Sequence, residues 1–107
     1  MEIAILAERL GLDVEDILEL LELYIENVAS DLSELDTALK AGDAAEAHKR
    51  SHSIKGASGN LGLNDLYEIA CEIDNKARLN EIQGLDLMVQ NFKEKYDGLV
   101  DEFKNIA

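Results

Sequence analysis

The sequence predicts an all-α protein, an antiparallel up-down four-helix bundle with a short extra helix at the N-terminus. The chain contains no Pro, the residue that helix interiors exclude most strongly. It is rich in Leu, Ala, Glu and Lys, which are good helix formers. Apolar residues also recur at alternating spacings of three and four, the period of one helix face. A chain of 107 residues fits one domain, so we expect residues 1–107 to form a single bundle.

The short N-terminal helix is expected to end at Gly11, and its apolar residues are Ile3, Leu6 and Leu10. A long helix should begin after Asp13, because Asp is a favoured N-terminal cap, and end at Ala41-Gly42. Its predicted core face consists of Val14, Leu18, Leu21, Ile25, Val28, Leu32, Leu35 and Leu39. These residues predict the longest helix of the bundle.

The next helix is predicted to begin at the capping box Asp43-x-x-Glu46 and to end near Gly62. Its core-facing residues are mostly small: Ala44, Ala47, Ser51, Ile54, Ser58 and Leu61. Small side chains permit close approach of neighbouring helices, so we expect this helix to lie centrally in the bundle.

Two further helices are predicted at about residues 64–79 and 85–106. The first should bury Leu66, Ile69, Ala70, Ile73 and Ala77. The second should bury Leu85, Val89, Phe92, Tyr96, Leu99, Phe103 and Ile106. Connections of two to five residues between successive helices favour antiparallel neighbours, which gives the up-down order.

The composition is strongly acidic, with 23 Asp and Glu against 10 Lys and Arg and a net charge of −13. Nucleic acid and anionic membranes would be repelled by most of such a surface, so neither is an expected partner. The first residues lack both a basic segment and a long apolar stretch, which predicts no signal peptide and no membrane span. Cys71 has no second Cys with which to form an internal disulfide. We therefore expect a cytoplasmic protein.

One segment departs from this acidic composition. Residues 47–64 contain Lys49, Arg50 and Lys55 and no Asp or Glu. The preceding residues, 1–46, carry a net charge of −11, and the following residues, 65–107, carry −5. We call residues 47–64 the basic segment. It indicates a site for a negatively charged group.

His52 lies within the basic segment, about 100° around the predicted helix from core-facing Ser51, and should therefore sit at the edge of the core. The residues three and four positions away share its face: His48, Lys49, Lys55 and Gly56. Gly59 continues that face. Because a mid-helix Gly costs about 1 kcal/mol relative to Ala, two of them beside His52 suggest space for the surface of another protein.

Histidine suits phosphoryl transfer. With an ordinary pKa of about 6.5 it is mostly neutral at pH 7 and offers a nucleophilic ring nitrogen. Lys49 and Lys55, one turn away, are placed to stabilise a phosphoryl group on His52. The transfer itself needs mainly positioning and charge neutralisation, so a helix surface suffices if a partner supplies the metal and the second reacting group.

Residues 48–78 resemble the histidine-containing phosphotransfer (HPt) domain, including the form at the N-terminus of chemotaxis histidine kinases. The matching residues are His52, Lys55, Gly56, Gly59 and Gly62, followed by a helix that ends in residues 72–78. The resemblance implies a phosphocarrier, not an enzyme. His52 would accept a phosphoryl group on Nε2 from a receiver aspartate or a histidine kinase and pass it to a response-regulator receiver.

The resemblance also implies roles for neighbouring residues. Lys55 would contact the phosphoryl group, while Gly56 and Gly59, with His48 beside them, would form the receiver-docking face. No bound cofactor is expected, Mg²⁺ would belong to the partner receiver, and the carrier would be a monomer. In chemotaxis-type members a Glu orients the imidazole, and the matching residue here is Asp74. Because Asp is one methylene shorter, we expect a water to intervene between Asp74 and His52.

Other interpretations of the same residues stay open. The pair His48-x-x-x-His52 could bind a metal on one helix face, with Asp74, Glu72 or Cys71 as the third ligand. The neighbouring Lys and Arg residues oppose a cation, so no metal site is expected. A helical adaptor that binds a partner without phosphate is the alternative function. Stable phosphate on His52 would distinguish the carrier from both.

Overall fold

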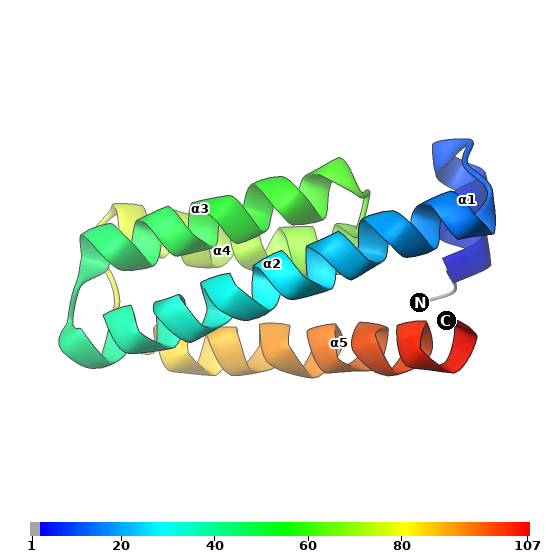
Figure 1. Cartoon of the computed structure of the whole chain (residues 1–107). Helices are drawn as coiled ribbons and strands as arrows, with labels where there is room; N and C mark the ends of the chain where they lie inside the picture. The colour runs from blue at the N-terminus through cyan, green and yellow to red at the C-terminus, as the bar shows by residue number, and fades with distance from the viewer. Residues whose placement is uncertain (1–2) are drawn as a thin grey trace.

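The computed structural model describes residues 3–107 and shows five α-helices: α1 (Ile3–Leu10), α2 (Val14–Ala41), α3 (Ala44–Asn60), α4 (Asn64–Arg78) and α5 (Leu85–Ile106). Helices α2 to α5 run alternately up and down the bundle, and α1 lies across the end at which α5 terminates (Figure 1). Within residues 3–107 there is no strand. The predicted fold class is therefore confirmed.

Helix α1 is fastened to the bundle by hydrogen bonds at both of its ends. The backbone N–H of Ile3 donates to Glu102 Oε1 on α5 (2.9 Å), and Arg9 Nη2 donates to the carbonyl oxygen of Gly62 (2.6 Å). Ile3, Leu6 and Ala7 are buried, whereas Leu10 is exposed, contrary to prediction. Residues 3, 6 and 7 share one side of this two-turn helix, and that side packs on the bundle.

The ends of α2 follow the predicted signals. Asp13 accepts a hydrogen bond from the backbone N–H of Asp16 (3.0 Å). Gly42 adopts φ 67°, and its N–H bonds back to the last turn. This left-handed conformation is readily available to Gly and ends the helix.

The buried face of α2 is wider than predicted and rotated from the expected line. Leu21, Val28, Leu32 and Leu35 are buried as expected, together with Ile17, Tyr24 and Ala38, which were not predicted. Val14 is exposed, and Leu18, Ile25 and Leu39 are only partly buried. The reason is that α2 packs against α1, α3 and α5, so its core face is centred between several neighbours.

Helix α3 begins with half of the predicted capping box. Asp43 accepts a hydrogen bond from the backbone N–H of Glu46 (3.0 Å), but the Glu46 carboxylate pairs with Arg50 Nε (2.8 Å) instead of returning to the cap. The buried residues are Ala47, Ser51, Ile54 and Ser58. They pack α3 mainly against α4 and then α2. The predicted central position is wrong, because α3 has two bundle neighbours and no extensive contact with α5.

Helices α4 and α5 lie close to their predicted bounds, and the connection between them spans six residues, 79–84, one more than expected. Ile69 and Phe103 are only partly buried, and Ile106 is exposed in the last turn of α5. Asp74, which was not predicted as a core residue, is buried on α4. Its burial is the feature of the fold that matters most for the site.

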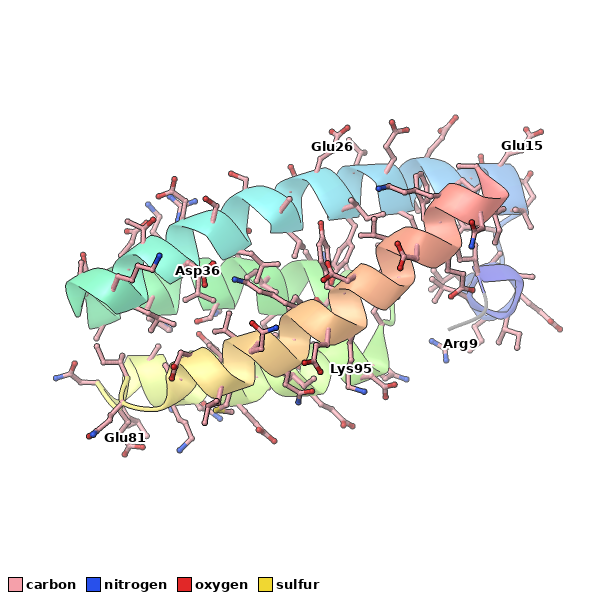
Figure 2. All side chains as sticks on the ribbon, turned by 90° about the horizontal axis from the view of Figure 1, so that it is seen from below. Arg9, Glu15, Glu26, Asp36, Glu81 and Lys95 are labelled. Atoms are coloured by element: carbon pink, nitrogen blue, oxygen red, sulfur yellow. The ribbon has the colours of Figure 1, made fainter. Side chains whose placement is uncertain are left out.

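The acidic surplus covers the outside of the bundle. Glu15 and Glu26 on α2 point away from the other helices (Figure 2). Asp36 on α2 instead turns towards α5 and pairs with Lys93. None of the helices in residues 3–107 has the length and apolar character needed to span a membrane.

Candidate functional site

Helix α3 holds His52 at the edge of the core, as predicted. The neighbouring residue Ser51 is buried, and its hydroxyl donates to the carbonyl oxygen of Ala47 (2.8 Å). The His52 side chain, in contrast, is 67% exposed. Two consecutive residues of α3 therefore differ in environment: Ser51 lies in the core, and the His52 imidazole faces solvent.

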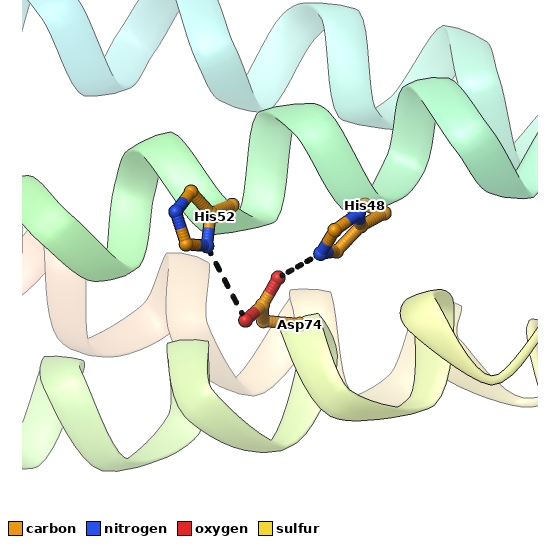
Figure 3. A group of neighbouring side chains, drawn as sticks. All are labelled: His48, His52 and Asp74. Atoms are coloured by element: carbon orange, nitrogen blue, oxygen red, sulfur yellow. Dashed lines mark ion pairs between the residues drawn. The ribbon is translucent and has the colours of Figure 1, made fainter.

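A buried carboxylate from α4 lies between two imidazoles of α3. Asp74 reaches towards His48 and His52 from the neighbouring helix (Figure 3). His48 Nε2 is 3.1 Å from Asp74 Oδ1, and His52 Nδ1 is 3.6 Å from Asp74 Oδ2. The Asp74 side chain is only 6% exposed. Two residues four apart on one helix thereby share one acid from the next helix.

The contacts of Asp74 are close without being complete hydrogen bonds. The separation of 3.6 Å from His52 Nδ1 is too long for one. His48 is near enough in distance, yet the buried Oδ1 of Asp74 makes no hydrogen bond of acceptable geometry. The separation from His52 Nδ1 is consistent with the expectation that the short Asp74 side chain does not bond His52 directly, and the water expected between them stays a prediction. The sequence did not indicate that His48 would be the nearer partner.

Of the two predicted lysines, only Lys55 reaches this group. Lys55 Nζ lies 3.6 Å from Asp74 Oδ2, and the side chain is 33% exposed. Lys49 is exposed and makes no ion pair within residues 3–107. Of these two lysines, Lys55 is therefore the one whose positive charge lies beside Asp74.

The two glycines have different surroundings. A Cβ added at Gly56 would meet no atom within 4 Å, whereas one at Gly59 would lie 3.0 Å from Cδ1 and Cε1 of the Tyr67 ring. Gly56 thus leaves open space beside His52, while Gly59 makes room for an aromatic ring of α4. Both border a hollow of about 420 Å³, lined by His52, Lys55, Gly56, Gly59, Asn60, Asn64 and Tyr67.

Comparison with known proteins agrees with this geometry. The model of the Hpt domain family matches residues 19–104. The chain belongs to the Hpt domain family. The crystal structure of histidine-containing phosphotransfer protein B (HptB) from Pseudomonas aeruginosa PAO1 is similar, with a TM-score of 0.81 and 27% sequence identity. The similarity covers 96% of this chain and 87% of the HptB chain. A comparison of this chain with curated protein sequences found no match.

Membership in the family establishes a general role. An Hpt domain takes part in histidine phosphotransfer within a phosphorelay, as a phosphocarrier and not as a catalyst. Hpt domains work with receiver and kinase partners. The all-α bundle and the exposed His52 are consistent with this role.

A second polar cluster of this Hpt domain was not foreseen from the sequence. Asp31 of α2 is buried and accepts hydrogen bonds from Ser53 Oγ (2.7 Å) and Arg50 Nη1 (3.3 Å) of α3. Hydrogen bonds to Glu46 and then Asp31 raise the pKa of Arg50. Arg50 thus belongs to a cluster on the α2 side of α3, so not all of the charge of the basic segment lies beside His52.

The contacts that Tyr24 and Tyr67 make between helices were also not predicted from the sequence. The Tyr24 hydroxyl and Ser58 Oγ are hydrogen-bonded (2.8 Å), and burial raises the pKa of Tyr24 to about 12. This bond joins α2 to α3 inside the core. Tyr67 covers Gly59, and a hydrogen bond to Cys71 raises the pKa of Tyr67. Neither contact follows from spacing along one helix, because each depends on which helices pack together.

The same Hpt site contains a set of potential metal ligands. Nitrogen atoms of His48 and His52 and a carboxylate oxygen of Asp74 all lie within 4.8 Å of one another, and no other such group is found in residues 3–107. Of the three candidates for a third ligand, the structure thus brings together only Asp74. Cys71 is partly buried and Glu72 is exposed, and neither belongs to the group.

Proposed function

We propose that His52 is the phosphorylated residue of this Hpt domain. It would accept a phosphoryl group from a receiver aspartate or a histidine kinase and pass it to a response-regulator receiver. The observation that carries this proposal is the orientation of the exposed His52 ring. Nδ1 faces the buried Asp74, and the other ring nitrogen, Nε2, lies on the side turned away from it (Figure 3).

This orientation supports attack by Nε2. A neutral imidazole with its proton on Nδ1 has its free electron pair on Nε2. As the Nε2–phosphorus bond forms and the bond from phosphorus to the donor oxygen breaks, the ring gains positive charge. Asp74, with Oδ2 3.6 Å from Nδ1, would stabilise that charge. His52 therefore needs no separate base.

Lys55 would serve the phosphoryl group itself. Its ammonium lies beside Asp74 at 3.6 Å, one turn from His52, and a flexible Lys side chain can turn towards the developing charge. Lys49, exposed on the same helix, would add a weaker and more distant positive charge. Mg²⁺ would come from the partner receiver, and the carrier would hold no cofactor for the transfer.

The receiver would dock over the open surface next to His52. Gly56 leaves space on that surface, and Gly59 lies at the same hollow beside Tyr67. His48, 38% exposed, borders the face on its other side. We expect the carrier to act as a monomer in the cytoplasm.

The test is phosphorylation by a phosphorylated receiver with Mg²⁺, comparing His52→Gln with His48→Gln. We expect acid-labile, alkali-stable phosphate on the unaltered protein and on His48→Gln, and none on His52→Gln. Retained labelling of His52→Gln would exclude the assignment. Circular dichroism should show that both variants are folded. Equal loss of labelling in two folded variants would also contradict the assignment, because it would not distinguish His52 from His48.

A further inference from the structure

Asp74 has an unusual position for a buried acid. Its side chain is 94% buried, its Oδ1 lacks a hydrogen bond of acceptable geometry, and it points between two imidazoles. Buried polar atoms are normally hydrogen-bonded, and a buried carboxylate oxygen without a hydrogen bond is available to coordinate a metal ion. We propose that His48, His52 and Asp74 bind Zn²⁺, and that bound Zn²⁺ prevents phosphorylation of His52.

The ligand types and their arrangement suit zinc. Two imidazoles and one carboxylate form a common three-ligand set for Zn²⁺, with water in the fourth position. His48 and His52 are four residues apart on α3, so their rings project from the same face, and Asp74 faces them from α4. Imidazole ligands favour Zn²⁺ over Mg²⁺, which prefers oxygen. The Mg²⁺ of a partner receiver would therefore not compete strongly.

Binding requires only small movements. The three ligand atoms lie within 4.8 Å of one another. Tetrahedral zinc with bonds near 2.0 Å needs its ligands about 3.3 Å apart. The His48 and His52 side chains are 38% and 67% exposed, so both rings are free to turn inwards while the buried Asp74 stays in place. The backbone of the two helices need not change.

Zinc and phosphoryl transfer require opposite protonation of the same ring. The nitrogen of His52 that faces Asp74 is Nδ1. If the electron pair of Nδ1 coordinates Zn²⁺, the ring proton must reside on Nε2. Nε2 then has no free electron pair with which to attack phosphorus. This consequence rests on the proposed role of His52, whereas the binding site itself does not.

Lys55 should oppose the metal. Its Nζ lies 3.6 Å from Asp74 Oδ2 and carries the charge that Zn²⁺ would replace. Removal of that charge should therefore tighten zinc binding. Such a gain would not be expected if Zn²⁺ bound elsewhere on this acidic surface, far from Lys55.

The first experiment measures Zn²⁺ binding by competition with a chromophoric zinc indicator. We expect one Zn²⁺ per chain, affinity more than about tenfold weaker in His48→Gln and in Asp74→Asn, and tighter binding in Lys55→Gln. Glu72→Gln, a change of an exposed acid on the same helix as Asp74, is the matched control and should bind normally. Absence of stoichiometric binding, or equal affinity in all four variants, would overturn the site.

The second experiment measures phosphorylation with and without Zn²⁺ at constant Mg²⁺, as the ratio of the two rates. The ratio should fall strongly for the unaltered protein and for Glu72→Gln, and much less for His48→Gln. Equal inhibition of His48→Gln would place the effect of zinc on the receiver and overturn the proposed block. If His52 were not the phosphorylated residue, the first experiment would still detect binding, and only the second would fail.

Discussion

Two buried aspartates lie on opposite sides of α3 and meet its side chains in different ways. Asp31 of α2 accepts hydrogen bonds from both Arg50 and Ser53. Asp74 of α4 faces His48, His52 and Lys55, and its Oδ1 makes no hydrogen bond. Both residues are nearly inaccessible, at 8% and 4% exposure. Both carboxylates are buried, but Asp31 has its hydrogen bonds satisfied, whereas Asp74 does not.

The difference separates a structural cluster from a functional one. A buried carboxylate with its hydrogen bonds satisfied joins α2 to α3 and offers nothing to a ligand. A carboxylate that lacks hydrogen bonds can respond when its neighbours gain charge, as His52 does when it attacks a phosphoryl group. We therefore expect changes at Asp31 to act on folding and changes at Asp74 to act on chemistry.

The largest stability effect is expected for Asp31→Ala. It leaves Ser53 and Arg50 without their buried acceptor, so the free energy of unfolding should fall by about 2 kcal/mol. Urea unfolding followed by circular dichroism measures this. Phosphorylation of the folded protein should stay near normal. A stable Asp31→Ala protein that cannot be phosphorylated would reverse the proposed distinction.

Asp74→Asn should show the opposite pattern. The amide keeps the shape of the side chain but removes the charge that faces His52, so phosphorylation should slow by about tenfold, equivalent to about 1.4 kcal/mol. The free energy of unfolding should change less than for Asp31→Ala, because no complete hydrogen bond is lost at Oδ1. Initial rates of labelling and urea unfolding test both parts. Strong destabilisation with a normal rate would make Asp74 a structural residue.

The two glycines extend the comparison along the same face. Gly56→Ala should raise the free energy of unfolding by up to about 1 kcal/mol, because Ala favours helix and its Cβ meets no neighbour. Gly59→Ala should be less stable than Gly56→Ala by about 1 kcal/mol, because its Cβ would displace the Tyr67 ring. Thermal unfolding of the pair gives the difference. Equal stabilities of Gly56→Ala and Gly59→Ala would show that the Tyr67 ring can move aside without cost.

A larger side chain at Gly56 tests whether this glycine gives a receiver access to His52 or serves the packing of the helices. Gly56→Gln should fold, since the position is open, but it should slow phosphotransfer by obstructing the approach of a receiver to His52. Receiver binding and labelling rates measure the obstruction. A normal rate would place the docking face elsewhere, and an unfolded protein would assign Gly56 to packing.

The smallest effect on stability is expected for Lys55→Ala. Its partly exposed side chain should contribute no more than about 0.5 kcal/mol to folding, while its loss slows phosphorylation. Melting temperature and labelling rate are measured on the same preparation. A large drop in melting temperature with normal labelling would give Lys55 a structural role instead.

Much of the fold was determined by the sequence alone. The caps at Asp13 and Asp43, the Gly at position 42 and the apolar spacing predicted where the helices begin and end, and the structure agrees within a residue or so. These signals suffice because a helix is built from hydrogen bonds between residues four apart. The pattern around His52 was visible for the same reason, since His48, Lys55 and Gly56 lie within one turn of it.

The tertiary structure decided which residues meet across helices. It placed Asp74 between His48 and His52, turned Arg50 towards Asp31, and laid Tyr67 over Gly59. It also rotated the core face of α2 to include Tyr24, which bonds Ser58. Such contacts depend on the rotation and offset of two packed helices. Those are set by how the small residues of α3 fit against α4 and α2, and the spacing within one helix carries no information about them.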